Sequence, residues 1–449
     1  MPMEKTISVI DLGTTKIVCL AGTKTPDGYK VIAACEAASQ GIMRGEVINN
    51  QSVLNSLRPL LSELEERTGN PTREVVVGIA GQYIKCKAAS SSINRNNKMD
   101  EITQAEVDSM CRNMFNSRVD PGEEVLHVVP QSYHVDEYKS ILKPAGMCGG
   151  TIEANYRIFI GKSVSAQHTK RCIESAGLKL SKLVLEPMAS ASAVLQEDEK
   201  ELGVAMVDIG GGTTDLLIYH DNIIRHTAVI PFGGNVITED IRQGCEVTLR
   251  QAEQMKIQYG SCYVDLAPEN KSIVISGIGG REPREIPFRF LSNIIEARMD
   301  EILEAVVFEI RQSGYAEKLP AGIVLTGGGA LLTHLPQFIK YKTGYDARIA
   351  RPRGIEFDGC DEVNSVTYSC AVGLMMQGFE PEYDSEEEQQ VDFETIFAGV
   401  ETKAPAKQNK TEKAPKVKKE KPEKTDNSGG LGSLFINIGK YFTDQDNEA

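Results

Sequence analysis

Two matching turns rich in glycine and threonine constrain the fold of this chain more than any other feature. The first reads DLGTTK from Asp11 to Lys16, and the second reads DIGGGTTD from Asp208 to Asp215. An apolar run enters each turn and another leaves it, which predicts a strand–turn–strand hairpin in both places. One such hairpin is a tight turn in many proteins. Two of them, each opening a strand-rich half of the chain, indicate an internal duplication.

The residue types in these turns are suited to holding phosphate groups. Glycine lets the backbone approach a ligand closely, successive backbone N–H groups form an anion-binding concavity, and threonine hydroxyls add donors. Lys16 is expected to supply a positive charge to a phosphate oxygen. Asp11 and Asp208 are expected to hold Mg²⁺ through waters, because that ion keeps much of its hydration shell. The candidate phosphate-binding residues are Gly13, Thr14, Thr15, Lys16, Gly210, Gly211, Gly212 and Thr213.

A third glycine-rich turn follows the apolar run GIVLT and comprises Gly327, Gly328 and Gly329. Ligands of α/β sheets bind where strand ends meet helix starts, so this turn is a candidate contact for adenosine. The alternative is an ordinary strand–helix turn. The run GKS from Gly161 resembles the end of a phosphate-binding loop, but Tyr156 stands where that motif needs glycine, and we interpret the run as structural.

Apolar strands alternate with amphipathic helices over residues 1–379, which predicts an α/β protein. A leucine- and valine-rich stripe at helical spacing predicts a helix from Val53 to Leu64 that Gly69 ends. Thr103 and Glu106 have the spacing of a capping box. A long helix is expected over residues 291–312.

Composition excludes several classes of protein. The net charge of −14 argues against nucleic-acid binding, which needs a basic surface. The ten cysteines are scattered without zinc-ligand spacing and are expected to be reduced. No apolar run reaches the roughly 18 residues of a membrane span. The N-terminus lacks the pattern of a secretory signal, so we expect a cytoplasmic protein.

The C-terminal part changes character after Phe379. Residues 380–394 contain eight acidic residues, and residues 402–424 contain nine lysines and three glutamates. We expect residues 380–428 to be a disordered linker, because they have too little apolar surface to offset ordering entropy.

A short apolar segment follows this linker. Its large apolar residues recur at the spacing of one helix face, and they are Leu431, Leu434, Phe435, Ile438 and Phe442. Twelve residues form a helix of about 18 Å, too short to span a bilayer. An amphipathic helix over residues 429–443 that lies on a membrane surface fits this pattern, and the lysine-rich linker would add attraction to anionic lipid. The alternative is docking on the chain's own core or on a partner protein.

The ordered motifs DxGTTK, LEPMASASAVL, DIGGGTTD, AEQMK and LTGGGA resemble the actin, chaperone and sugar-kinase ATPase superfamily. The segment HVVPQSY from His127, the segment KPAGM from Lys143 and the segment GGNVITEDI from Gly233 are similar to the bacterial FtsA family of cell-division proteins. The short apolar C-terminal segment is a further trait of that family. The similarity covers about residues 5–379.

This resemblance implies an actin-like α/β fold in two lobes with a duplicated core. Lobe 1 would have a core subdomain of residues 1–85 and 161–197, with an FtsA-type subdomain inserted at residues 86–160. Lobe 2 would have a core subdomain of residues 198–230 and 300–379. A small subdomain of residues 231–299 would be inserted in lobe 2.

The resemblance also implies roles for single residues. Glu186 stands where chaperone relatives carry a glutamate that positions the attacking water, so the catalytic candidates are Glu186, Asp208 and Asp11. The alternative for Glu186 is a capping or pairing role beside Pro187. Glu253 and Lys256 would reach the ribose and adenine from one helix face, or else form a solvated charge pair.

The function implied is that of an ATP- and Mg²⁺-binding protein of cell division with at most slow ATP hydrolysis. It would polymerise on the cytoplasmic face of the inner membrane at the division site, bind anionic lipid, tether FtsZ filaments and recruit other division proteins. The C-terminal peptide of FtsZ would dock on residues 231–299. The alternatives are a sugar-kinase-like enzyme or a pilus-assembly relative of the same superfamily. A heat-shock chaperone would need a β-rich domain for which too few residues remain.

Overall fold

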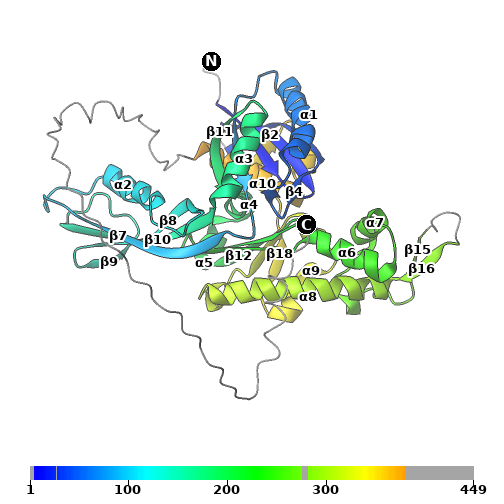
Figure 1. Ribbon diagram of the computed structural model, residues 1–449. Helices are drawn as coiled ribbons and strands as arrows, with labels where there is room; N and C mark the ends of the chain where they lie inside the picture. Colours follow the sequence, from blue (N-terminus) through cyan, green and yellow to red (C-terminus); the bar gives the residue numbers. More distant parts are fainter. Residues whose placement is uncertain (1–4, 27, 276–281, 381–449) are drawn as a thin grey trace, which may run out of the picture. The chain divides into compact units, whose positions relative to one another are not determined.

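The computed structural model describes residues 5–26, 28–275 and 282–380 of the 449-residue chain. Two sheets form its centre (Figure 1). The first sheet has the strand order β11-β6-β1-β2-β3-β19 and the second has the order β14-β13-β12-β17-β18. The strands of the first sheet are β1 (Thr6–Leu12), β2 (Lys16–Thr25), β3 (Gly28–Ala38), β6 (Glu74–Ile79), β11 (Lys179–Leu185) and β19 (Ile355–Phe357). Those of the second are β12 (Val204–Ile209), β13 (Thr214–His220), β14 (Ile223–Ile230), β17 (Ile323–Thr326) and β18 (Ala347–Ile349).

The two sheets repeat one topology, as the paired hairpins predict. In the first sheet β1 pairs antiparallel with β2, β2 pairs antiparallel with β3, and β1 pairs parallel with β6, which pairs parallel with β11. In the second sheet β12, β13, β14, β17 and β18 show the same order and the same strand directions. Both predicted hairpins are therefore the central strands of equivalent sheets.

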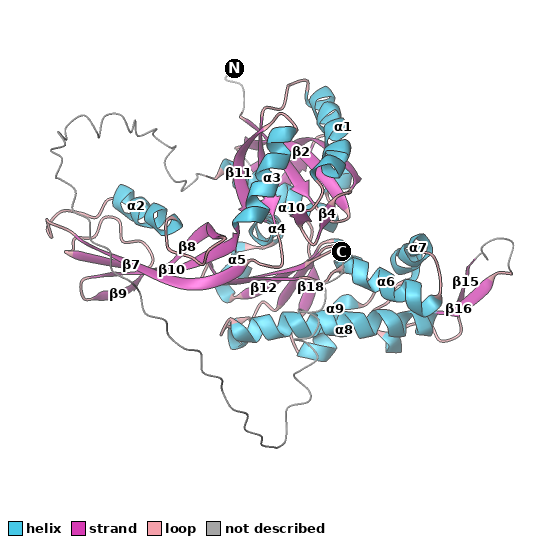
Figure 2. Ribbon diagram, in the orientation of Figure 1, coloured by secondary structure: helices cyan, strands magenta, loops and turns pink. Residues whose placement is uncertain are grey.

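Helices cover the sheets in layers (Figure 2). Helices α1 (Asn50–Thr68) and α3 (Ser163–Ser175) pack together against one side of the first sheet, with α1 on β2 and β3 and α3 on β11. Helix α10 (Ser369–Phe379) packs on β1, β2 and β6, and α4 (Glu186–Val194) packs on α10 and also on β12 and β13. Helix α8 (Phe288–Gln312) packs on β13 and β14. The helices α4 and α10 thus lie between the two sheets.

Local sequence explains the helix ends. Helix α1 begins after Asn49, whose side chain accepts from the Ser52 amide, and it ends at Gly69 with φ +67°. Helix α2 (Gln104–Phe115) begins with the predicted capping box of Thr103 and Glu106. The long helix α8 is confirmed and begins three residues earlier than expected.

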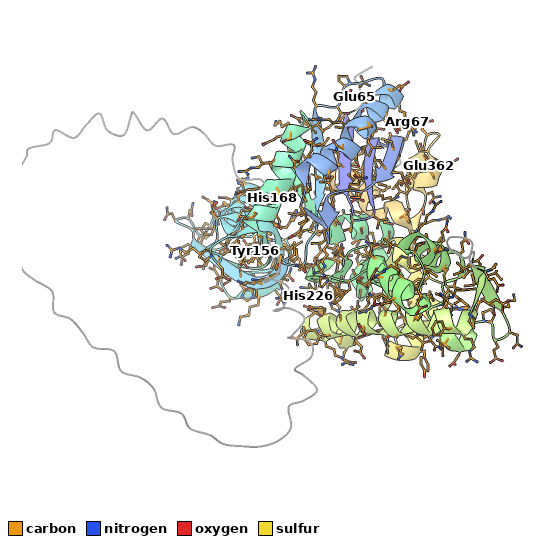
Figure 3. The ribbon with its side chains drawn as sticks, turned by 45° about the vertical axis from the view of Figure 1, so that its right-hand side comes forward. Glu65, Arg67, Tyr156, His168, His226 and Glu362 are labelled. Atoms are coloured by element: carbon orange, nitrogen blue, oxygen red, sulfur yellow. The ribbon has the colours of Figure 1, made fainter. Side chains whose placement is uncertain are left out.

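The inserted region forms a separate four-stranded antiparallel sheet with the order β7-β10-β8-β9. Its core includes Tyr156, which is 1% exposed and is packed with residues of α2 (Figure 3). The strands are β7 (Lys85–Asn94), β8 (Glu123–Val135), β9 (Tyr138–Ile141) and β10 (Thr151–Lys162). The run GKS is the junction of β10 with α3, which agrees with its structural interpretation.

Polar side chains connect the inserted sheet to β14 of the second sheet. The Gln131 side chain donates to the Ile224 carbonyl at 2.9 Å and accepts from Arg225 at 3.2 Å. His226, which is labelled in Figure 3, lies 3.1 Å from Glu309 of α8. Burial lowers the pKa of His226, but Cys86 and Glu309 outweigh it and raise the pKa to about 9.

The remaining elements are short or lie beyond the second sheet. Helices α6 (Gly234–Cys245) and α7 (Leu249–Tyr259) pack on each other, and α6 packs on α8. Strands β15 (Ser272–Ile275) and β16 (Arg284–Pro287) form a two-stranded ribbon, as do β4 (Ile42–Met43) and β5 (Glu46–Val47). The other helices are α5 (Glu197–Leu202) and α9 (Leu335–Thr343), with 3-10 turns η1 (Val264–Leu266), η3 (Ala316–Lys318), η4 (Gly328–Leu331), η5 (Asp361–Val363) and η6 (Val366–Tyr368).

Candidate nucleotide-binding site

The tips of the two central hairpins face each other. A Cβ atom on Gly211 would lie 1.9 Å from the Thr15 hydroxyl oxygen, and one on Gly212 would lie 2.6 Å from the Thr14 hydroxyl oxygen. Only glycine at these two positions leaves room for the threonine side chains of the other hairpin. The structure therefore brings together the phosphate-binding candidates of both hairpins, which are more than 190 residues apart in sequence.

The start of α6 packs against the second hairpin. The amides of Gly234 and Asn235 donate to the carbonyls of Gly210 and Gly211, each at 2.8 Å. Because the first N–H groups of a helix have no intrahelical partner, these two contacts satisfy donors at the α6 start. A Cβ atom on Gly233 would lie 2.6 Å from the Gly210 carbonyl oxygen. Glycine at position 233 is therefore required by the hairpin beside it.

The third glycine-rich turn also packs on the second hairpin. Gly327 has φ +79°, and a Cβ atom there would lie 2.2 Å from an Asp208 carboxylate oxygen. A Cβ on Gly329 would lie 2.3 Å from the Ile209 side chain. The strand β17 continues into the 3-10 turn η4, and α9 begins only at Leu335. The turn is thus placed beside the phosphate candidates, as a nucleotide contact requires.

Glu253 and Lys256 lie on one face of α7 and turn toward the start of α6. They form an ion pair of 2.8 Å. The Lys256 ammonium donates to the Gly234 carbonyl at 2.9 Å and to the Thr238 hydroxyl at 2.7 Å, and the Lys256 side chain is only 12% exposed. The pair is therefore half-buried next to the second hairpin, and its predicted contact with ribose and adenine remains a prediction.

Four carboxylates gather beneath the hairpin tips. Asp11 and Asp208 are the next-to-last residues of β1 and β12. Glu186 begins α4, and Asp215 lies on β13 opposite Asp208. Burial and the Asp208 charge raise the pKa of Asp11 to about 6, although Lys16 opposes this. Burial raises the pKa of Asp208 to about 6, although Ser190 opposes this by donating to it at 2.6 Å.

The pKa values of the other two carboxyl groups, Glu186 and Asp215, are raised as well. Burial, together with the charges of Asp11, Asp208 and Asp215, holds the pKa of Glu186 well above its usual range. Burial and the charges of Asp208 and Asp11 do the same for Asp215. Glu186 fits under the first sheet because β6 carries Gly78, where a Cβ would lie 2.9 Å from the Glu186 side chain.

This set of carboxylates fits a divalent cation. Asp215 is 5% exposed, and its Oδ1 atom is buried without a hydrogen-bond partner. A buried, unpartnered carboxylate oxygen among other carboxylates is costly unless a cation neutralises it. Oxygen ligands are those that Mg²⁺ takes in proteins. Asp11 and Asp208 are the residues predicted to hold Mg²⁺, and their charges act on both Glu186 and Asp215.

We expect Asp208→Asn to stabilise the chain in EDTA at about pH 7.5 by on the order of 2 kcal/mol. A carboxyl with a raised native pKa contributes its full stability below the unfolded value of 3.8 and loses it as pH rises through about 6. Asparagine removes this loss and can still accept from Ser190. The stability gap measured by thermal unfolding should therefore shrink as the pH falls toward 5. Equal stability of the two proteins at both pH values would contradict the raised pKa.

Lys16 is held by Glu36 in this structure. The ammonium lies 2.6 Å from a Glu36 oxygen, to which the Tyr368 hydroxyl also donates at 2.7 Å, and it lies 3.5 Å from the centre of the Tyr368 ring. Both partners of the ion pair are partly exposed, at 25% and 47%. A phosphate that uses Lys16 therefore has to compete with Glu36.

We expect Glu36→Gln to tighten ATP binding by up to about fivefold, because a partly exposed ion pair is worth at most about 1 kcal/mol. The comparison is an equilibrium titration of ATP against both proteins. Glu63→Gln is the matched control, since Glu63 pairs with Arg67 on α1, and it should leave the affinity unchanged. Weaker binding by Glu36→Gln would show that Glu36 supports the site instead of competing for Lys16.

Sequence reasoning missed several residues of this site. Asp215 stands inside the motif DIGGGTTD and Ser190 inside LEPMASASAVL, so membership of these motifs was a usable signal for both residues. Glu36, Tyr368 and Cys370 come from segments without a motif. The Cys370 sulfur lies within 4.8 Å of an Asp11 carboxylate oxygen, and burial beside the carboxylates raises the pKa of the thiol well above the usual range.

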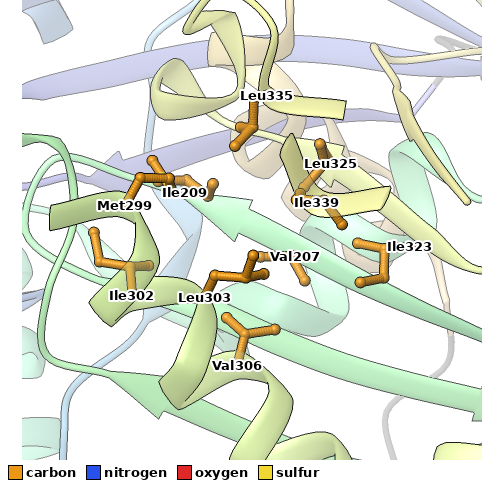
Figure 4. Close-up of a pocket in the computed structure, with 10 residues that line it drawn as sticks. All are labelled: Val207, Ile209, Met299, Ile302, Leu303, Val306, Ile323, Leu325, Leu335 and Ile339. Carbon is orange, nitrogen blue, oxygen red and sulfur yellow. The ribbon is translucent and has the colours of Figure 1, made fainter. Parts of the chain in front are cut away.

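An apolar cavity in the core of the second sheet is not a ligand site. It has a volume of about 10 Å³ and lies between β12, β17, α8 and α9 (Figure 4). That is about the space of one water, and its aliphatic lining offers no hydrogen bond. The predicted linker over residues 380–428 and the predicted membrane residues Leu431, Leu434, Phe435, Ile438 and Phe442 lie outside the described residues, apart from Glu380.

The chain is similar in sequence to known cell-division proteins. The profile described as cell division protein FtsA matches residues 205–373, and that of the SHS2 domain inserted in FtsA matches residues 81–160. The FtsA protein of Neisseria meningitidis is 35% identical over 375 residues, which are 83% of this chain and 90% of the relative. The FtsA protein of Bacillus subtilis is 31% identical over 366 residues, which are 82% of each chain.

The fold is similar to that of solved structures of low sequence identity. The PilM–PilN type IV pilus biogenesis complex contains a chain that matches with a TM-score of 0.61 at 16% identity, covering 84% of this chain and 99% of that one. MreB5 of Spiroplasma citri bound to ADP matches with a TM-score of 0.51 at 16% identity, covering 84% of this chain and 96% of that one.

The duplicated sheets, the facing hairpins and the acidic site define the actin-like ATPase fold, here with an inserted SHS2 domain. Within that class, the chain belongs to the FtsA family of cell division proteins. Among the described residues, no helix combines the length and the apolar character that crossing a membrane requires.

Proposed function

We propose that this chain binds ATP with Mg²⁺ between its two central hairpins. The proposal rests on one observation, which is that Gly211 contacts Thr15 and Gly212 contacts Thr14. These contacts bring the two candidate phosphate-binding turns together beside the carboxylates. Backbone N–H groups and hydroxyls of both turns would bind the phosphates. Asp11 and Asp208 would hold Mg²⁺ through waters. The solved structures of Spiroplasma citri MreB5 with ADP and with AMPPNP support a nucleotide in this fold.

The buried carboxylates would also favour slow hydrolysis of the bound ATP. A carboxylate can orient a water or accept its proton. Glu186 lies at the start of α4 between the first sheet and the Asp11–Asp208 pair, and its raised pKa in the ion-free site would fall once Mg²⁺ neutralises the neighbouring charges. We propose Glu186 as the residue that positions the attacking water.

The same proposal extends to the division site. The chain would polymerise at the cytoplasmic face of the inner membrane, bind the C-terminal peptide of FtsZ on residues 231–299, and recruit other division proteins. The helical spacing from Leu431 to Phe442 supports a lipid-binding segment, and the linker charge of +6 over residues 402–424, from nine lysines and three glutamates, supports anionic lipid as its target. Polymerisation would multiply the weak affinity of one such helix.

We expect the full-length chain with ATP to sediment with anionic vesicles, and a chain that ends at Asn427 to stay in the supernatant. Phe435→Glu, which changes the apolar face, should abolish sedimentation, because it places a charge in the buried face of the helix. Asn437→Glu is the matched control off that face and should retain most of it.

Added FtsZ tests the second half of this proposal. It should sediment with vesicles only in the presence of the full-length chain, and FtsZ that lacks its C-terminal peptide should not sediment. Sedimentation of the shortened chain with vesicles would contradict the tether. If the full-length chain sediments with vesicles while the added FtsZ stays in the supernatant, the adaptor role alone is contradicted.

A further inference from the structure

The carboxylate site contains a sulfur atom that the proposed binding of Mg²⁺ and ATP does not use. Cys370 is the second residue of α10, which packs on β1 and α4. Asp11 is the next-to-last residue of β1, and Glu186 is the first residue of α4. One oxygen of Asp11, one oxygen of Glu186 and the Cys370 sulfur all lie within 4.8 Å of one another. The thiol therefore stands inside the acidic cluster.

A second observation comes from Asp215, whose charge reaches both Cys370 and Glu186. The Oδ1 atom of Asp215 is buried without a hydrogen-bond partner, in a residue that is 5% exposed and feels the charges of Asp208 and Asp11. Buried polar atoms in native proteins almost always have a partner. A positive ion among these carboxylates would satisfy that oxygen.

The ligand types decide which ions fit. Mg²⁺ takes oxygen ligands at 2.0–2.1 Å and keeps several waters, so a thiol adds nothing to its binding. Thiolate is a soft ligand that selects ions such as Zn²⁺. Zn²⁺ binds cysteine sulfur at about 2.3 Å and carboxylate oxygen at about 2.0–2.2 Å in a tetrahedron, which places ligand atoms roughly 3.3–3.8 Å apart. The three atoms of this cluster lie within 4.8 Å of one another, so small side-chain movements suffice to reach that geometry.

We propose that Asp11, Glu186 and Cys370 form a binding site for a thiophilic divalent cation of the Zn²⁺ type, whose occupation excludes the Mg²⁺–nucleotide complex. The sulfur–hydrogen bond breaks, the sulfur–metal bond forms with the same electron pair, and the proton leaves to solvent. No electron is transferred. Cation binding rests on side-chain geometry alone, and only the exclusion of nucleotide rests on the proposed function.

Cadmium absorption in the absence of nucleotide tests the site. Cd²⁺ bound to thiolate has an ultraviolet charge-transfer band, and we expect one strong equivalent per chain that Zn²⁺ displaces and Mg²⁺ does not. Cys370→Ser should remove this band and weaken Zn²⁺ binding at least tenfold. The matched controls are Cys360→Ser, at a buried cysteine outside the cluster of Asp11, Glu186 and Cys370, and Cys148→Ser, at an exposed one; both should keep the band.

Two further experiments test the same site. Glu186→Gln retains the thiol but should weaken Zn²⁺ binding, and Zn²⁺ should protect Cys370 of the unmodified chain from alkylation as read by mass spectrometry. A band of equal strength in folded Cys370→Ser, or alkylation unchanged by Zn²⁺, would overturn the proposal. ATP binding is measured in separate titrations, with and without Zn²⁺. A chain that binds Zn²⁺ but no ATP would refute the proposed function and leave the cation site unaffected.

Discussion

Replacing Gly211 with alanine is expected to weaken ATP binding at least tenfold. The added methyl would lie 1.9 Å from the Thr15 hydroxyl oxygen and 3.3 Å from the Asn235 side-chain oxygen. It would occupy the space where the two hairpins approach and where a phosphate would meet their backbones. A tenfold loss corresponds to about 1.4 kcal/mol, and an equilibrium titration of ATP measures it.

A double-mutant cycle assigns this loss to the facing hairpins. Thr15→Ala removes the clashing oxygen and leaves the Thr15 Cβ at 3.3 Å, so Gly211→Ala should cost clearly less in that background. The matched control is Gly234→Ala, whose methyl would first meet the flexible end of Lys256 at 3.3 Å. We expect it to change affinity by less than about threefold, or roughly 0.7 kcal/mol. Additive effects of the Gly211 and Thr15 substitutions would show that the two turns do not meet.

Gly373→Ala is expected to destabilise the folded chain by about 3 kcal/mol, near the upper end for overpacking of a core. A Cβ on Gly373 would lie 1.7 Å from the Ala189 carbonyl oxygen, where α10 crosses α4. The nearest atoms all belong to the backbone of Ala189. Because the helices α4 and α10 hold the two backbones, neither can move away easily. Thermal unfolding should show a loss of roughly 4 °C.

The crossing of α4 and α10 also sets the acidic site, because α4 carries Glu186 and Ser190 and α10 carries Cys370. Gly373→Ala should therefore weaken ATP binding as well as stability. Gly328→Ala is the control for stability, since its methyl would have only ordinary contact with Thr367 at 3.9 Å. An unchanged unfolding temperature for Gly373→Ala would mean that the two helices are farther apart than described.

Local chemistry made a large part of the fold predictable. Glycine and threonine at a tip between two apolar runs identify a hairpin wherever the rest of the chain lies, so both central hairpins were evident. Helix ends were predictable for the same reason, because Gly69 and the Thr103–Glu106 box act on their own neighbours. The repeated order of the hairpins also predicted the duplicated sheets.

Contacts between distant segments could not be predicted in this way. Nothing near Gly211 in the sequence indicates that it meets Thr15, because that contact depends on the layers of helices between the two sheets. Helix α10 is apolar on nearly every face, so its pattern did not show that Cys370 turns toward Asp11. The pairing of Lys16 with Glu36 likewise depends on the register of β2 with β3 and on Tyr368.

Hydrogen–deuterium exchange of the full-length chain with and without Mg²⁺–ATP tests the central claim most directly, which is that one nucleotide is held by both hairpins. The account predicts that ATP slows exchange together in the peptides that contain Gly13 to Lys16, Gly210 to Thr213 and Gly327 to Gly329. It also predicts that Gly211→Ala removes this protection at both hairpins, although the substitution lies in only one of them. Protection of a single hairpin, or of neither at saturating ATP, would contradict the account.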